Sequence, residues 1–313
     1  MLLNGVQLQC LKIHQYQITG LGFLRFLTEY LHAFHQLIQA FLTQMVLYFF
    51  HIEDTIFPVI HRYFGNPVIR HLLRMEKAAA FLETHRYAGL VGASMGFTKM
   101  EGTTVNIKDK VAYSALQNIQ ASMVAGNAAN VPGNGISVPK QLVAGGVMAL
   151  NLKGGQKDTL GNAINSEWMP TDTKALLMGE DIAADALGNT ANPNKIANPD
   201  NLKFSEKMRT LFIGEDSGQH VNNFLWAYNV DTKALSRIMS IPAGGESTGL
   251  HAVDELNGWT YIMSNFQHAG DWGSIHNVVK GTLDPMIKAN YKDKFGAAVG
   301  YLTAEATQAK LAK

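Results

Sequence analysis

Acidic side chains recur at points where the sequence predicts the end of a β-strand. Asp200 follows a proline at the start of one apolar segment, and Glu215 and Asp216 close the next. Glu101 and Glu246 each stand beside a glycine. Converging carboxylate oxygens are the ligands that Ca²⁺ takes, about six to eight at a time. The pattern therefore predicts a cation site built from strand ends.

Amide and imidazole side chains extend this set of donors. Asn201, Asn222 and Asn223 also adjoin strand ends, and His251 and His268 are the best-placed histidines. Carboxylates and imidazoles together hold iron and other transition metals. Taken singly, each acid fits a solvated turn or a strand cap as well, because acidic side chains often brace their own turns. Spacing alone leaves both interpretations open.

Composition restricts the partners and the ligands. The 313 residues carry 26 basic and 25 acidic side chains, so the formal net charge is +1. This balance argues against a nucleic acid partner, which a basic surface would attract. The single cysteine, Cys10, excludes an intrachain disulfide framework and a thiolate cluster. Oxygen and imidazole nitrogen are left as metal ligands.

The first 74 residues differ from the rest, because they hold six of the eleven histidines and only three acids. Apolar residues at helical spacing predict an amphipathic helix over about 22–50. His32 and His35 share one face of it, where they could hold a metal or form a partly solvated edge. No secretory signal is visible, and the apolar run over 41–50 is about half the length of a membrane span. Good helix formers predict a second, short helix over 75–83.

From about residue 96 the hydrophobic period changes to two, which predicts strands. A Lys108-Asp109-Lys110 turn joins strands 104–107 and 111–116 into a hairpin. Further strands follow, at 146–152, 202–204, 210–214, 223–230, 235–241, 250–253 and 260–266. Such a series is typical of a sandwich or a propeller. We therefore predict an all-β chain: residues 75–282 form a partial β-propeller of about three blades, 1–74 a mainly helical segment, and 283–313 a partly helical C-terminal tail.

One segment matches a catalytic pattern without its context. Gly92-Ala-Ser94-Met-Gly96 fits the Gly-x-Ser-x-Gly motif of serine hydrolases. In that class an apolar strand precedes the serine, whereas a helical pattern over 78–90 precedes it here. The motif therefore does not predict a nucleophilic serine.

Seven pieces of the sequence, in the same order, resemble the C-terminal half of the PhoX-type alkaline phosphatases. They cover the region from Phe81 to Trp272 and comprise residues 81–87 (Phe-Leu-Glu-Thr-His-Arg-Tyr), 97–102 (Phe-Thr-Lys-Met-Glu-Gly), 198–201 (Asn-Pro-Asp-Asn), 213–217 (Ile-Gly-Glu-Asp-Ser), 222–223 (Asn-Asn), 246–249 (Glu-Ser-Thr-Gly) and 266–270 (Phe-Gln-His-Ala-Gly). An ordered series of pieces is more specific than any single motif.

The resemblance implies a β-propeller phosphomonoesterase that binds calcium and iron in its central channel. It further implies a small phosphate ester as substrate and a periplasmic or secreted location. Lys99 stands where the family often has a phosphate-contacting arginine, and Glu101 is implied as a metal ligand beside it. Clustered cations offset phosphate charge and polarise the P–O bonds. The candidate metal ligands of the whole chain are Glu101, Asp200, Glu215, Asp216, Glu246 and His268.

The chain also departs from the family. The N-terminal half of the family has no counterpart here, and Cys10 lies outside any matching motif. About three blades are recognisable where a closed ring needs about four or more, so unpaired strand edges predict self-association. We expect a truncated member whose first 74 residues are an unrelated extension. Two alternatives stay open: a metal-binding propeller fragment without catalysis, and a Ca²⁺-dependent lactonase-like propeller.

Overall fold

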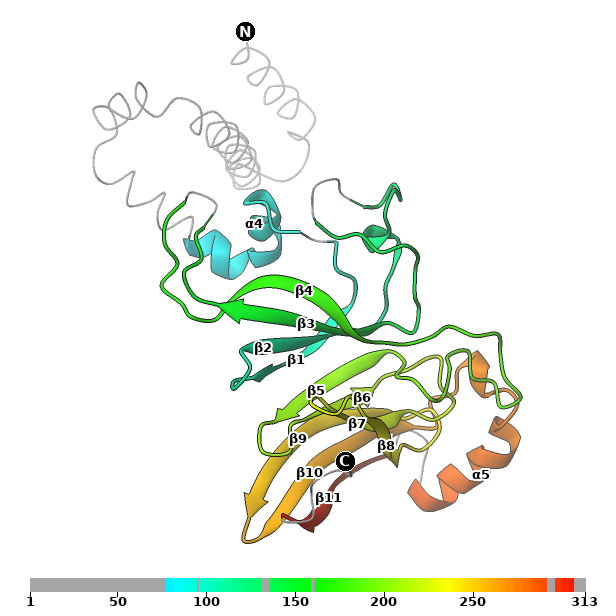
Figure 1. The fold of residues 1–313 in the computed structure, drawn as a ribbon. Helices are drawn as coiled ribbons and strands as arrows, with labels where there is room; N and C mark the ends of the chain where they lie inside the picture. The colour runs from blue at the N-terminus through cyan, green and yellow to red at the C-terminus, as the bar shows by residue number, and fades with distance from the viewer. Residues whose placement is uncertain (1–76, 95, 131–134, 159–160, 292–295, 307–313) are drawn as a thin grey trace, which may run out of the picture. The chain divides into compact units, whose positions relative to one another are not determined.

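The computed structural model describes residues 77–94, 96–130, 135–158, 161–291 and 296–306, which Figure 1 draws in colour. The chain divides into two compact units, Met1–Leu90 and Val91–Lys313. The helix predicted over 22–50, with His32 and His35, lies outside the described residues, and so does Cys10.

The described part of the first unit is helical. Residues 77–82 form one helical segment, and α4 spans Thr84–Leu90 after a bend at Glu83. Thr84 Oγ1 donates to the carbonyl oxygen of Ala80 over 2.6 Å at this bend. The short helix predicted over 75–83 is thus present in its described part. Across the described ranges, no helix has the length and hydropathy that a membrane span requires.

The described residues of the second unit form three antiparallel sheets (Figure 1). The first sheet has the order β1-β2-β3-β4, with β1 Met100–Asn106, β2 Val111–Leu116, β3 Gly146–Lys153 and β4 Met169–Met178. The second has the order β5-β6-β7-β8, with β5 Pro199–Ser205, β6 Thr210–Glu215, β7 Phe224–Asn229 and β8 Leu235–Ser240. The third has the order β9-β10-β11, with β9 Glu246–Leu256, β10 Trp259–Ala269 and β11 Gly296–Glu305.

Local chemistry explains the predicted hairpin that opens the first sheet. β1 and β2 pair in antiparallel register from Asn106↔Val111 onward. The side-chain oxygen of Asn106 accepts from the Asp109 backbone N–H over 3.0 Å, which closes the turn in the way asparagine commonly does. The turn ends at Lys110, whose φ of 52° is left-handed.

The first strands of the three sheets lie side by side. β5 contacts β1 on one side and β9 on the other. The backbone N–H of Phe204 donates to Thr104 Oγ1 over 3.1 Å, and Asn201 Nδ2 donates to the carbonyl oxygen of Ser247 over 3.3 Å. Thr104 and Phe204 both lie late in their strands, whereas Asn201 and Ser247 both lie early, so these innermost strands run in the same direction. This radial arrangement of sheets is that of a propeller, and the predicted all-β partial propeller is confirmed.

The sheets pack face to face through alternate residues of each strand. Residues 113, 115, 147 and 149 of the first sheet share one buried cluster with residues 211, 213, 226 and 228 of the second. The intervening residues of the second sheet, at 212, 225 and 227, pack with Ile262 of the third. Successive residues of a strand point to opposite faces of its sheet. The second sheet therefore contributes alternate residues to two separate cores, one on each face.

Two strands were absent from the sequence prediction. β4 is exposed along most of its length, and so is β11. An outer strand of a sheet buries few apolar side chains, so it lacks the alternating pattern on which the prediction depends. β11 falls within the tail predicted over 283–313, where it pairs with β10.

Short helices complete the second unit. η1 spans Ala121–Met123 and η2 spans Ser274–His276. α5, at Lys280–Tyr291, links β10 to β11 and is the helical part expected of the tail. It buries Ile287 in a cluster with Val221, Ala243 and Ala269.

Candidate metal centre

Each sheet brings a pair of polar side chains to the same end of the second unit. One member lies at the start of the innermost strand, and the other lies at or just after the end of the second strand. Antiparallel pairing places these two points together: the Gln117 N–H donates to the Lys99 carbonyl over 2.9 Å, and the Asp216 N–H to the Asn198 carbonyl over 3.2 Å. The three pairs are Glu101 with Gln117, Asp200 with Asp216, and Glu246 with His268.

A left-handed residue precedes each of the three strand-start acids by two positions. Lys99 has φ 46°, Asn198 has φ 45° and Gly244 has φ 73°. This conformation is open to glycine and asparagine but costs other residues about 1 kcal/mol or more. The repeated turn brings the chain into the innermost strand from the same side in every sheet. The acids therefore occupy equivalent places in the three sheets.

Two of these acids lie at strand irregularities that change the direction of their side chains. Glu101 lies where the β1–β2 register shifts between Met100 and Thr103. Asp200 lies where the β5–β6 register shifts between Pro199 and Asn201. A β-bulge of this kind bends a strand and redirects a side chain, and such bulges are frequent next to active sites.

The glycine after Glu101 permits a close backbone approach. A Cβ atom on Gly102 would lie 2.4 Å from the Asp200 carbonyl oxygen and 2.8 Å from the Leu202 nitrogen. No side chain fits in that space, so the Glu101-Gly102 sequence is what lets β1 and β5 meet at the acidic end. The spacing of Glu101 and Asp200 depends on this contact.

Three potential ligand atoms converge at the centre of the cluster. One atom from each of Asp216, Glu246 and His268 lies within 4.8 Å of the other two. Glu246 is buried and the other two side chains are half-buried. Of the six metal ligands predicted from the sequence, these three form the compact group. Glu101 and Asp200 adjoin it, as their electrostatic effects show.

The hydrogen bonding of His268 defines what its second nitrogen can do. Nδ1 lies 3.0 Å from the carbonyl oxygen of Gly244, and Nε2 lies 3.3 Å from Glu246 Oε2. A carbonyl oxygen only accepts, so Nδ1 carries the proton. In neutral histidine Nε2 then presents a lone pair to a carboxylate. Two acceptors face each other, and the contact requires a proton or a metal ion between them.

The pKa values reflect burial first and an excess of negative charge second. Burial, a hydrogen bond shared with Glu246, and the charges of Glu101, Glu246 and Asp216 raise the pKa of Asp200 to about 7. Burial and the Glu246 charge also raise the pKa of Asp216, although Gln117 opposes this. Burial lowers the pKa of His268, but its bonds to Gly244 and Glu246 outweigh that and raise it overall. Carboxylates crowded in this way favour a bound cation or a shared proton.

Lys99 lies at the exposed rim of the cluster. Its Nζ donates to Glu101 Oε1 over 2.8 Å, and about half of the lysine side chain, 52%, is exposed. The hydrogen bond to Glu101 raises the pKa of Lys99, against a smaller lowering by burial. Its ammonium group is therefore charged and accessible to an anion.

Amide side chains hold the acids in place. Gln117 Nε2 donates to Asp216 Oδ2 over 3.0 Å, and Asn201 Nδ2 donates to Asp200 Oδ2 over 3.0 Å. Asn198 is buried; its amide nitrogen donates to the carbonyls of Gln117 and Val143 over 2.8 and 2.7 Å. Asn198 thereby ties the first sheet to the second. Gln117 was not a sequence candidate, although its position just after β2 matches that of Asp216 just after β6.

Glu215 lies elsewhere and plays a structural part. The side chain is fully buried. Its Oε1 accepts from the Ala197 N–H over 2.9 Å and from Trp226 Nε1 over 2.6 Å. Its Oε2 accepts from the Phe224 N–H over 3.0 Å and lies 3.1 Å from His220 Nδ1. With its oxygens used in this way, Glu215 is not among the converging ligand atoms.

Other sequence candidates also lie outside the cluster. His251 is exposed on β9, opposite Met263. Asn222 and Asn223 brace loops by donating to the Ile241 and Gly245 carbonyls over 2.7 and 2.6 Å. Ser94 lies in an irregular, exposed segment rather than after a strand, so the Gly-x-Ser-x-Gly match has no nucleophile-elbow geometry.

Comparisons with known proteins give a distant structural match. No family model matches the chain, and no curated protein matches it. A solved structure, "Pseudomonas fluorescens PhoX in complex with vanadate, a transition state analogue", is similar to it with 19% sequence identity and a TM-score of 0.45. The match covers 73% of this chain and 37% of the PhoX chain. The chain thus spans little more than a third of that protein, and we assign it to no family.

Proposed function

We propose that Asp216, Glu246 and His268 bind a divalent cation, and that this centre serves the hydrolysis of small phosphate monoesters. The observation that carries the proposal is the contact of His268 Nε2 with Glu246 Oε2. A metal ion shared by the imidazole and the carboxylates would satisfy both acceptors at once. It would also offset the negative charge that raises the pKa of Asp200.

The chemistry of the donors fits a metal. Two carboxylates and one imidazole suit iron or another divalent transition metal. Asp200 and Glu101 add oxygen donors, which calcium prefers, so a second ion beside the first is part of the proposal. A bound cation would supply charge to polarise a phosphoryl group.

The residues of the chain have separate tasks in this proposal. Lys99 would bind a phosphoryl oxygen at the rim as a point charge. Glu101 would hold the Lys99 ammonium group in place and contribute an oxygen to the ions. Gln117 and Asn201 would fix the carboxylates that they contact. With the sequence resemblance to PhoX-type phosphatases, we extend the proposal to a protein that acts in the periplasm or outside the cell.

Cation binding without catalysis is the second candidate. The described sheets form an arc, and an arc leaves part of a propeller channel open. The same cluster could then bind ions without hydrolysing a phosphate ester.

Metal content and turnover of the full chain, measured together, test the proposal. The chain would be stripped with chelator, reloaded with Fe²⁺ and Ca²⁺, dialysed, and assayed by mass spectrometry for metal and with an aryl phosphate for hydrolysis. We expect Glu246→Gln and His268→Gln each to lower metal affinity by at least about 10-fold. His251→Gln, at the exposed histidine of β9, is the matched control and should retain wild-type metal content.

The outcomes separate the candidates. Metal with phosphate ester turnover supports the full proposal, and metal without turnover supports the binding function alone. Hydrolysis of a lactone but not of the aryl phosphate would favour a lactonase-like site. A folded chain that takes up neither metal would contradict the proposal.

A further inference from the structure

The two sheets at the ends of the arc each present a face on which no other sheet packs within the described part of residues 91–306. The first-sheet end face comprises Met100, Val105, Ser114, Met148 and Leu150. The residues that alternate with Ser114, Met148 and Leu150 along β2 and β3 point the other way. They pack against the second sheet and comprise residues 113, 115, 147 and 149. The third-sheet end face comprises Trp259, Met263, Asn265, Val299 and Tyr301. Ile262, between two of these along β10, packs against the second sheet.

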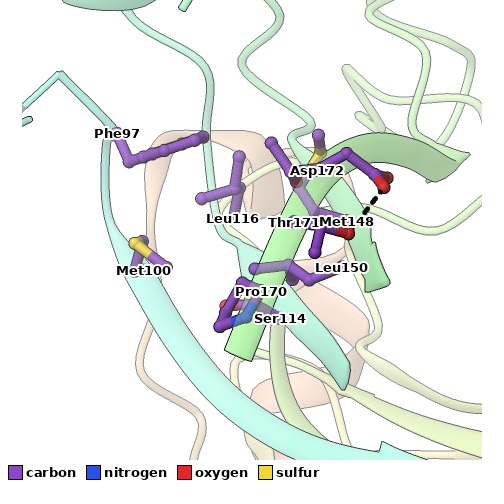
Figure 2. A pocket seen from close by; sticks show the side chains of 10 residues that line it. Phe97, Met100, Ser114, Leu116, Met148, Leu150, Pro170, Thr171 and Asp172 are labelled. Atoms are coloured by element: carbon purple, nitrogen blue, oxygen red, sulfur yellow. Dashed lines mark hydrogen bonds between the residues drawn. The ribbon is translucent and has the colours of Figure 1, made fainter. Parts of the chain in front are cut away.

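Both end faces carry exposed apolar side chains, and residues from 119–123 and 136–142 pack with Leu116 and Met148 over one part of the first. On the first, Met100 and Val105 are 52% and 39% exposed, and on the third, Met263, Val299 and Tyr301 are 38%, 79% and 61% exposed. A hollow of about 250 Å³ indents the first-sheet end face. Figure 2 shows Phe97, Met100 and Leu150 among its lining side chains. Apolar surface gathered in this way marks a site of association.

Each end face also holds a buried polar atom without a partner. Among the described residues, Ser114 Oγ and Asn265 Oδ1 are both buried and form no hydrogen bond. Ser114 borders the hollow. A buried polar atom of this kind costs about 1–3 kcal/mol when unpaired.

We propose that two copies of this chain associate head to tail, with the third-sheet end face of each packed on the first-sheet end face of the other. Propellers close with about four to eight blades. The described residues of one copy supply three sheets, those of two copies supply six, and those of three copies supply nine. Of these numbers of sheets, only six falls within the range of blades that closed propellers have. Each contact joins two different faces, and the pair closes because a two-fold rotation makes the same contact a second time.

Closure would have a consequence for the candidate metal centre. The innermost strands β1, β5 and β9 line the channel side of each arc, and their acid-bearing ends face the same way. The second copy would complete the channel into which both centres open. This consequence rests on the proposed function, whereas the association itself does not.

The mass of the full chain in solution tests the association. Sedimentation equilibrium should give twice the chain mass of 34.3 kDa. Val105→Asp damages the first-sheet end face, and Tyr301→Asp damages the third-sheet end face. Each variant alone should be monomeric, with unchanged circular dichroism. Val278→Asp, which changes an exposed apolar side chain away from both faces, is the control and should stay dimeric.

A mixture of the two variants gives the decisive result. A head-to-tail pair can form from one Val105→Asp chain and one Tyr301→Asp chain. In that pair the two substituted faces pack on each other at one interface, and the two wild-type faces form the other interface. Mixing should therefore restore a species of dimer mass that neither variant forms alone. A wild-type chain that stays monomeric at its highest soluble concentration would overturn the proposal. Loss of the dimer through only one of the two variants would also overturn it, because it indicates a contact between identical faces.

Discussion

Asp200 and Glu215 are both acids near the end of a strand, yet their surroundings assign them opposite parts. Asp200 lies among like charges with Asn201 as a neutral hydrogen-bond donor, and its pKa rises to about 7. Glu215 lies in the core with four donors around its two oxygens. The first side chain is suited to binding a cation or a proton. The second is suited to holding β6, β7 and the loop before β5 together.

The pH dependence of the metal-free chain tests the charge cluster. Asp200 has a folded-state pKa of about 7 against an ordinary 3.8, so between these values the folded state binds more protons than the unfolded state. Stability from this group is therefore present at low pH and is lost as pH rises towards 7 and beyond. In chelator, the melting temperature of the wild type should fall more steeply from pH 5 to 8 than that of Asp200→Asn. Parallel slopes for the two proteins would show that the folded-state pKa of Asp200 is not raised.

Replacing Glu215 tests its assignment to the core. In Glu215→Gln an amide N–H₂ must face backbone and indole N–H donors, so we expect a loss of about 3 kcal/mol in the free energy of unfolding. The remaining folded protein should bind metal with unchanged stoichiometry. Glu246→Gln should show the reverse, with metal binding lost and a smaller change in urea stability. A Glu215→Gln variant that is fully stable but binds no metal would show that Glu215 is a metal ligand.

At the scale of elements, the site depends on how closely β1 approaches β5. The two backbones meet at Gly102, where a side chain has no room. Left-handed turns at Lys99, Asn198 and Gly244 then set the entry of each innermost strand. The three acids are placed by the same local device, repeated in each sheet, so a change in one strand entry alters the geometry of the whole cluster.

Gly102→Ala should separate the two strands. Its Cβ would lie 2.4 Å from the Asp200 carbonyl oxygen, and relief of such overpacking costs about 1–3 kcal/mol. We expect the urea midpoint and the metal affinity to fall together, because Glu101 and Asp200 move with the backbone. Gly218→Ala is the matched control, since a Cβ there has no atom within 4 Å. Equal stability of the two variants would contradict the close approach.

At the scale of the whole molecule, the candidate centre joins the second sheet to the third, and Glu101 adds the end of the first beside it. An ion bound by Asp216, Glu246 and His268 would link β6 to β9 and β10, whose residues are far apart in the chain. A ligand that binds only the folded state stabilises it in proportion to the logarithm of its concentration. The stability of the second unit should therefore report on occupancy of the site.

Cation addition should raise the melting temperature of the chelator-treated chain. At a free concentration of about 100 times the dissociation constant, the gain is about 2.7 kcal/mol in the free energy of unfolding. The gain should shrink by at least about 1.4 kcal/mol in Glu246→Gln, in line with the 10-fold or greater loss of affinity expected there, and persist in His251→Gln. Equal gains in both variants would show that the cation binds elsewhere.

The sequence by itself determined the strands that bury alternate residues and the location of acids at their ends. It missed β4 and β11, whose exposed side chains lack the alternating pattern. It could not separate Glu215 from Asp216, because neighbouring residues at a strand end point to opposite sides and both are acids. Only the packing of β6 between two other sheets decided that Glu215 enters the core and Asp216 joins Glu246 and His268. Glu246 and His268 lie on the paired strands β9 and β10, whereas Asp216 meets them through contacts between the second and third sheets that no local pattern encodes.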